Sequence, residues 1–260
     1  MYKHIFLLLI FLNCSNYQAQ QLEYKKIQMG IVLGTSLNIN KSESKIIKTN
    51  NPGYDFSIGM NLIKNFNQNL GFNTGIEFDF SRMKYQFQDS IHYDFRENII
   101  YSKSEKNNLE TYEKFTLLER KQKPIFLSIP TMFIFKTDLI GYNRYFAKFG
   151  MRHNFILKEV VTDTDIKNNI NEKMKVSKDI AFYSGSIGIT GGTEWNYSGS
   201  STIQFELGYF YGITNLQRND AIIGDVDKYK TLYIKENNNT IYKTFNSTRN
   251  QLSLKISFLF

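Results

Sequence analysis

The feature that most constrains the fold is the alternation in the last nine residues, 252–260. Apolar side chains occupy every second position, at Leu252, Leu254, Ile256, Phe258 and Phe260. Serine or lysine fills the positions between the first four of these. Strict alternation predicts a β-strand with one apolar face and one polar face. This pattern occurs in an edge strand of a soluble sandwich and also in the closing strand of a membrane barrel. The choice between these two folds depends on the rest of the chain.

Seven further segments alternate in the same way and are predicted to be strands. They are 29–39, 54–62, 70–87, 124–135, 145–157, 183–197 and 203–213. The pattern of the third slips near Arg82 and Met83, which predicts a bulge or a strand that leaves the membrane. Pro130 lies inside the fourth and cannot donate to a β-ladder, so a bulge or register break is expected there.

The connections between these segments differ systematically in length. Short connections at 64–69, 136–144 and 198–202 alternate with longer ones at 40–51, 88–122, 159–181 and 215–247. Up-and-down barrels of the bacterial outer membrane have long loops outside and short turns on the periplasmic side, which would place both mature termini in the periplasm.

The composition favours a membrane barrel over a soluble barrel of the lipocalin kind. Aromatic residues make up 15% of the chain, as expected for a barrel with aromatic girdles. Glycines and charged residues share the polar faces of the strands, as a narrow polar lumen requires. We therefore predict an all-β fold, an eight-stranded antiparallel up-and-down transmembrane β-barrel in the cell outer membrane.

The N-terminus has the features of an export signal. A short polar start precedes the apolar run 5–12, which is too short to span a bilayer. We predict a signal peptide over residues 1–20 and the barrel domain over 21–260. Cys14, the one cysteine, is either an acylated lipoprotein cysteine or is removed with the signal. Asn13 is bulkier than a lipobox prefers, which favours removal.

The formal net charge of +8 raises the question of nucleic-acid binding. The lysines are scattered among acids and form no dense basic run, so we expect no nucleic-acid partner. We interpret the surplus as solvated loop charge that faces anionic headgroups. The expected partners are outer-membrane lipid and lipopolysaccharide, the barrel-assembly machinery, and a surface or secretion protein.

Charged side chains on the polar faces of the predicted strands should meet inside the barrel. They are Glu77, Asp79, Lys148, Arg152, Glu194, Glu206 and Lys255. An ion-selective pore would be lined by charges of one sign. The mixed signs favour a salt-bridged plug, because the side chains of an eight-stranded barrel about fill its lumen.

No arrangement of residues typical of catalysis or metal binding is present. His153 is predicted on the lipid-facing side of its strand, but no serine or acid is evident beside it to complete a nucleophile–base pair. We therefore predict no catalytic residue, no bound metal and no cofactor.

Aromatic residues are interleaved with charges in two of the long connections. They are Tyr93, Phe95, Tyr101, Tyr112 and Phe115 in the first, and Tyr229, Tyr233 and Tyr242 in the second. Such loops either bind a partner protein or glycan, or fold on one another over the barrel mouth. Around the second set, residues 230–242 alternate weakly, which suggests a hairpin above the membrane.

Two segments, 124–135 and 145–150, resemble the outer-membrane β-barrel family typified by PorT, which is common in Bacteroidetes. The family typically has a Glu-Ile-Pro strand followed by an aromatic-rich strand that ends in glycine. Here Ser128 replaces the glutamate before Ile129 and Pro130, and the second segment ends in Gly150.

The resemblance implies the same fold and location, and a secretion role for one branch of the family. We expect an exported barrel with a filled polar lumen that acts by structure or loop-mediated binding, with secretion as one role. A small-solute porin or a lipid-modifying enzyme is the alternative.

Overall fold

The computed structural model describes residues 25–42, 47–48, 52–93, 115–165, 170–174, 180–198, 201–217, 232–236, 239–243 and 247–260. The predicted signal peptide, including Cys14, lies outside these residues. Within them, no helix is long and apolar enough to cross a membrane.

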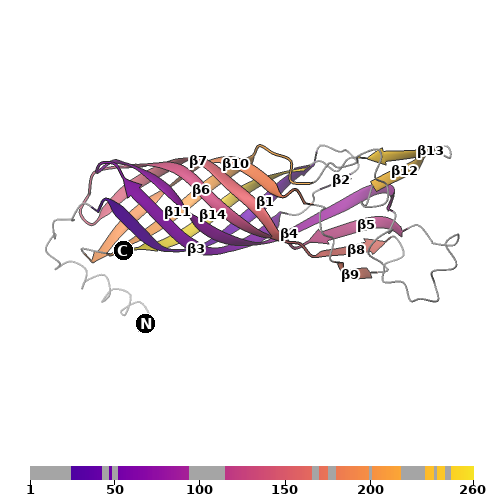
Figure 1. Cartoon of the computed structure of the whole chain (residues 1–260), viewed down its shortest axis with the longest axis horizontal. Coiled ribbons are helices and arrows are strands. Elements are labelled where there is room, and N and C mark those ends of the chain that lie inside the picture. Colours follow the sequence, from indigo (N-terminus) through magenta and orange to yellow (C-terminus); the bar gives the residue numbers. More distant parts are fainter. Residues whose placement is uncertain are drawn as a thin grey trace, which may run out of the picture.

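Eight antiparallel strands close into a barrel, as the sequence predicts (Figure 1). They are β1 (Ile27–Ser42), β3 (Gly53–Asn65), β4 (Leu70–Tyr93), β6 (Ile125–Lys136), β7 (Asn143–Lys158), β10 (Tyr183–Ser198), β11 (Ser201–Gly212) and β14 (Ser247–Leu259). The order around the barrel is β3-β1-β14-β11-β10-β7-β6-β4, and β4 pairs with β3 to close it. Closure leaves none of the eight with a free edge inside the membrane, which a lipid environment requires.

The two faces of the barrel wall are inverted relative to a soluble protein. On β14 the side chain of Leu254 is 52% exposed on the outer face, whereas Ser253 beside it is 1% exposed on the inner face. Phe258 and Phe260 are also exposed, and Phe260 exchanges two backbone hydrogen bonds with Met29 of β1. The alternation in the last nine residues therefore belongs to the strand that closes the barrel onto its first strand.

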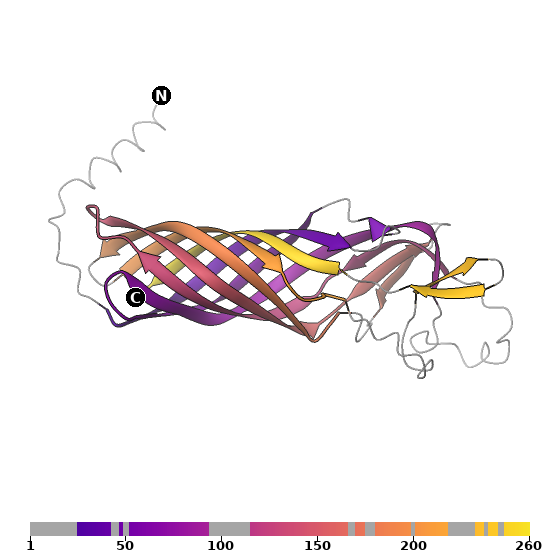
Figure 2. The ribbon, with the colours of Figure 1, turned by 90° about the horizontal axis from the view of Figure 1, so that it is seen from above.

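The ends of the barrel differ as predicted. The connections at the end that holds the C-terminus are short, and the opposite end carries a second sheet (Figures 1 and 2). We call this second sheet the extension. It contains β2 (Ile47–Lys48), β5 (Phe115–Gln122), β8 (Val161–Asp165), β9 (Ile170–Met174), β12 (Leu232–Glu236) and β13 (Asn239–Lys243), together with the last part of β4.

The segments predicted as loops therefore contain paired strands. In the extension β5 pairs with β4 and β8, and β12 with β13 forms the hairpin that the weak alternation suggested. Tyr93 and Phe115 are register partners in β4 and β5, and Tyr233 and Tyr242 are register partners in β12 and β13. The other aromatic residues of these connections, Phe95, Tyr101, Tyr112 and Tyr229, lie outside the described residues.

Neither expected bulge is present at its predicted position. Near Met83, however, β4 leaves the barrel sheet and pairs with β5 of the extension, which agrees with the predicted alternative of a strand that leaves the membrane. The strand keeps its phase there, and Met83 and Tyr85 are buried on the same side as Ser81. What changes there is the lining of the interior, from polar to apolar. At Pro130 the register of β6 with β4 and with β7 is unchanged, and pairing to β4 simply skips two positions. A local gap in the ladder is enough to accommodate the missing N–H.

The lipid-facing position of Leu254 yields a stability prediction. Leu254→Arg should lower the free energy of unfolding by about 2–4 kcal/mol, because a guanidinium near mid-membrane loses its hydration. Ile140→Arg, in the exposed turn between β6 and β7, is the matched control and should change stability by about 1 kcal/mol or less. Urea titration of the protein refolded in lipid vesicles measures both. Equal losses would contradict the assignment of the outer face as the membrane surface.

Candidate functional site

The seven charged residues predicted for the lumen all lie inside the barrel and are buried. They come from β4, β7, β10, β11 and β14, and each follows the inward phase of its strand. The structure adds four more lumen charges: Asp55, Lys136, Arg144 and Arg249.

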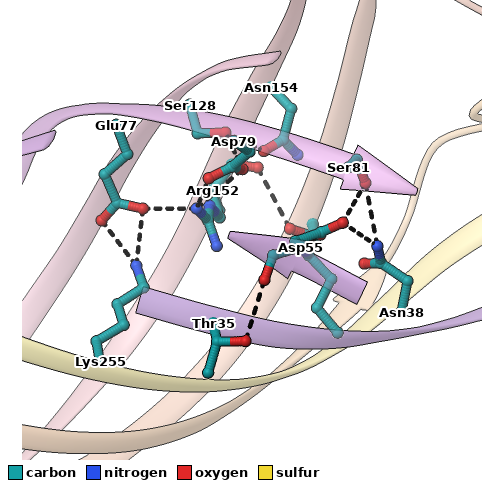
Figure 3. Close-up of polar contacts among 12 residues, drawn as sticks. Thr35, Asn38, Asp55, Glu77, Asp79, Ser81, Ser128, Arg152, Asn154 and Lys255 are labelled. Carbon is teal, nitrogen blue, oxygen red and sulfur yellow. Dashed lines mark hydrogen bonds and ion pairs between the residues drawn. The ribbon is translucent and has the colours of Figure 1, made fainter. Parts of the chain in front are cut away.

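A central cluster joins four of the predicted residues (Figure 3). Arg152 donates to Glu77 at 2.5 Å and to both oxygens of Asp79 at 2.8 and 3.0 Å. The Lys255 ammonium contacts both oxygens of Glu77, at 2.7 and 2.9 Å. Asp79 also accepts from the Ser128 hydroxyl at 2.6 Å. Each carboxylate is thus fully engaged, which offsets its loss of hydration.

A second cluster, toward the extension, surrounds Asp55 of β3. Its carboxylate accepts hydrogen bonds from Asn38, Ser81, Gln251 and Arg249 (Figure 3 shows the first two). The sequence shows Asp55 on a polar strand face, but its importance was missed. Arg249 stands where the last strand begins, before the alternation is regular, so its inward direction was not evident.

Three more ion pairs lie nearer the short turns. Lys148 of β7 pairs with Glu206 of β11. Glu194 of β10 pairs with Lys136 at 3.2 Å and receives Arg144 Nε at 2.9 Å. Acids and bases therefore alternate along the lumen, and no ring of like charge forms among the described residues.

Most of these ion pairs skip at least one strand of the barrel wall. Lys255 on β14 reaches Glu77 on β4, past β1 and β3. Arg152 on β7 reaches the same carboxylate from the other side, past β6. The contacts therefore join strands that are not neighbours in the barrel wall, in addition to the hydrogen bonds between neighbouring strands.

Three phenylalanines share the lumen with the charges, and sequence reasoning missed them. Phe126 lies 4.6 Å from the Arg249 guanidinium, and Phe146 lies 4.9 Å from the Lys148 ammonium. Phe210 lies 5.6 Å from the Arg152 guanidinium. Gly188 makes room for Phe210, because a Cβ there would come within 2.3 Å of the ring. The aromatic faces stabilise the cations and fill space that a water column would need.

Buried apolar residues also form two layers in the interior. Ile63, Ile134, Phe146 and Leu259 form a buried cluster near the short turns. Toward the extension, Met83, Tyr85, Val161, Ile180 and Leu216 are buried. Burial raises the pKa of Tyr85, whose hydroxyl accepts from Gln217. The central and second clusters thus lie between two less polar layers, and the pairs of Glu194 with Lys136 and Arg144 lie beyond the first of these layers, at the short turns.

His153 occupies the outer face of β7, where the sequence placed it. Its Nε2 lies 3.1 Å from the Thr131 hydroxyl and its Nδ1 lies 2.9 Å from the Tyr183 hydroxyl. These contacts were not foreseen, and they satisfy the imidazole on a lipid-facing surface. In the described part of the chain, no group of histidine, cysteine or acidic side chains is arranged to hold a metal ion.

A closed ring of eight tilted strands with an apolar outside and a charged inside defines a transmembrane β-barrel. Residues 17–218 match the family model described as outer membrane protein beta-barrel domain. The chain belongs to this family, and its location is the cell outer membrane, as predicted.

Several solved outer-membrane barrels are similar to the structure. Ail, the attachment invasion locus protein of Yersinia pestis, has 11% identity and a TM-score of 0.37, covering 91% of this chain and 100% of Ail. OprG from Pseudomonas aeruginosa has 10% identity and a TM-score of 0.40, covering 92% and 99%. The protease OmpT from Escherichia coli has 9% identity and a TM-score of 0.38, covering 94% and 99%. No curated protein matches the sequence.

The central cluster yields the second stability prediction. Arg152→Met should lower the free energy of unfolding by about 3–5 kcal/mol, because Glu77 and Asp79 would be left buried without this cation. The control is Lys121→Met, which removes a partly exposed partner of Glu119 and should change stability by about 1 kcal/mol or less. Chemical unfolding in detergent micelles compares them. Similar small effects would show that the lumen pairs are well hydrated.

Proposed function

We propose that this protein is a non-conducting outer-membrane barrel that acts through its extension rather than through its lumen. The observation that carries the proposal is the cross-braced interior. Ion pairs at three levels and three phenylalanines occupy the space between opposite walls. A solute path would require several of these contacts to break together.

The extension supports a binding role because its strands have open edges. In the described residues β9 pairs with β8 alone, and β13 pairs with β12 alone. An open edge presents unpaired N–H and C=O groups that can add a strand from a partner protein. By the usual asymmetry of such barrels, the end with the longer connections lies outside the cell. The extension would then meet partners at the cell surface.

Secretion is the role that we propose for this binding. The support is the resemblance of residues 124–135 and 145–150 to the PorT-like family, one branch of which serves secretion and gliding. A barrel with a blocked lumen would contribute to such a machine as a rigid anchor, and its exposed sheet would hold another component.

A conductance measurement tests the closed lumen. The refolded protein in planar bilayers should show no steady channel at 100 mV. The double variant Lys255→Ser/Glu77→Ser removes a pair from the central cluster while keeping its charge balance, and should raise conductance if the barrel remains folded. Heat-dependent migration on gels checks folding. Steady channels of the unaltered protein would favour the porin alternative.

A proteome comparison tests the secretion role. Cells without the gene should lose surface or secreted proteins, which should accumulate in the periplasm. Cells whose chain has residues 232–243 replaced by a glycine–serine linker should show the same loss, because the β12–β13 hairpin is removed. Cells carrying Ile140→Arg are the control and should keep the normal proteome. An unchanged proteome in the deletion strain would overturn the secretion role while leaving the closed-lumen result intact.

A further inference from the structure

Five exposed or half-exposed cations gather on the outer face where the barrel meets the extension. They are Lys48, Arg82, Lys84, Lys121 and Lys123, which we call the basic patch. They lie on β2, β4, β5 and the residue that follows β5, so neighbouring strands present them side by side.

The strand register brings like charges together in this patch. Lys84 and Lys121 are direct partners across β4 and β5. The next outward positions on the same two strands are Arg82 and Lys123, because Met83 pairs with Gln122 between them. Like charges directly opposite each other destabilise a sheet. An arrangement of this kind is expected where an anion offsets the repulsion.

One carboxylate pairs with two of the five cations in the patch. Glu119 contacts Lys84 at 2.7 Å and Lys121 at 3.1 Å. Burial alone would raise the pKa of Glu119, but hydrogen bonds from these two lysines lower it, so the group is ionised. Within the described part of the chain, neither Arg82 nor Lys123 pairs with a carboxylate. The patch therefore keeps a strong positive excess.

The patch adjoins the apolar belt of the barrel. Tyr54 pairs with Arg82 across β3 and β4, and the next outward pair below is Phe56 with Phe80, whose rings stack at 6.5 Å. One outward step along a strand is about 7 Å. The cations thus follow directly beyond an aromatic row, at the depth where lipid headgroups begin.

The cations are densest on β4, β5 and the adjoining β2. At their extension-side ends, β10, β11 and β14 present Tyr183, Tyr211 and Thr248 on their outer faces. The corresponding ends of β1 and β7 each carry a single exposed lysine, Lys41 and Lys158. General adhesion to an anionic membrane would not require this concentration. A localised patch suits a ligand with clustered negative charge.

We propose that the basic patch binds the phosphate groups of a phosphorylated glycolipid in the surrounding outer leaflet. Arginine and lysine form charge-assisted hydrogen bonds with phosphate oxygens. The acyl chains of the same lipid would lie against the aromatic row formed by Tyr54, Phe56 and Phe80. Binding would hold a lipid at the base of the extension. The bound lipid would then fix the height of the extension above the membrane. This inference does not depend on the secretion role.

The test compares two double variants of the full mature protein, refolded in detergent, with purified lipid A as the probe. Arg82→Gln/Lys123→Gln should weaken binding about tenfold or more, since two phosphate-binding cations are lost. Lys26→Gln/Lys64→Gln removes two charges from the opposite rim and is the matched control, which should bind normally. Native mass spectrometry with graded lipid A gives the affinities, and gel migration confirms folding.

A second arm uses lipid A from which the phosphates have been removed. The unaltered protein should bind it about as weakly as the Arg82→Gln/Lys123→Gln variant binds the intact lipid. Equal affinity for the two lipids would overturn the proposal, because recognition would then be apolar. Equal weakening in both double variants would also overturn it, because only overall charge would matter.

Discussion

The structure depends on charge balance inside a narrow, closed lumen. A buried charge without a partner destabilises a fold by several kcal/mol, and this barrel buries charges from seven of its eight strands. The balance is achieved between strands that are not neighbours, as Lys255 of β14 and Arg152 of β7 both pair with Glu77 of β4. Each pair therefore helps to specify the register of strands that never touch. A slip of one residue would turn these charges toward lipid.

The membrane environment explains why the outer face of the barrel is apolar and why this arrangement ends part of the way along β4. Within the membrane the outer face must be mainly apolar, and the polar side chain of His153 on that face is hydrogen-bonded to its neighbours Thr131 and Tyr183. Beyond Ser81 the constraint changes because the outer face meets water and headgroups. There Arg82 and Lys84 face outward, while Met83 and Tyr85 form an apolar interior. β4 crosses this boundary without a break, so one strand belongs to two environments.

The proposed function divides rigidity and binding between two parts of the molecule. The barrel, with its lumen ion pairs, is the fixed base, and among the described residues the extension has open strand edges at β9 and β13. The basic patch lies at the junction, where a bound lipid would stabilise the base of the extension. Glycines such as Gly188 contribute indirectly, because they allow Phe210 to lie in the lumen against Arg152. In the proposed function, the filled lumen would support surface binding by making the barrel under the extension stiff.

The sequence by itself determined the eight membrane strands, their faces, the asymmetry of the connections and the inward direction of seven charges. Period-two alternation is a local property, so it can be read without knowing what lies opposite. Only the tertiary structure decided which acid meets which base, since Glu77 and Lys255 become neighbours through barrel closure. It likewise revealed Asp55 with Arg249 and the strands inside the predicted loops. Those features depend on register between distant segments, and a register is set by packing across the whole barrel rather than by any one stretch of sequence.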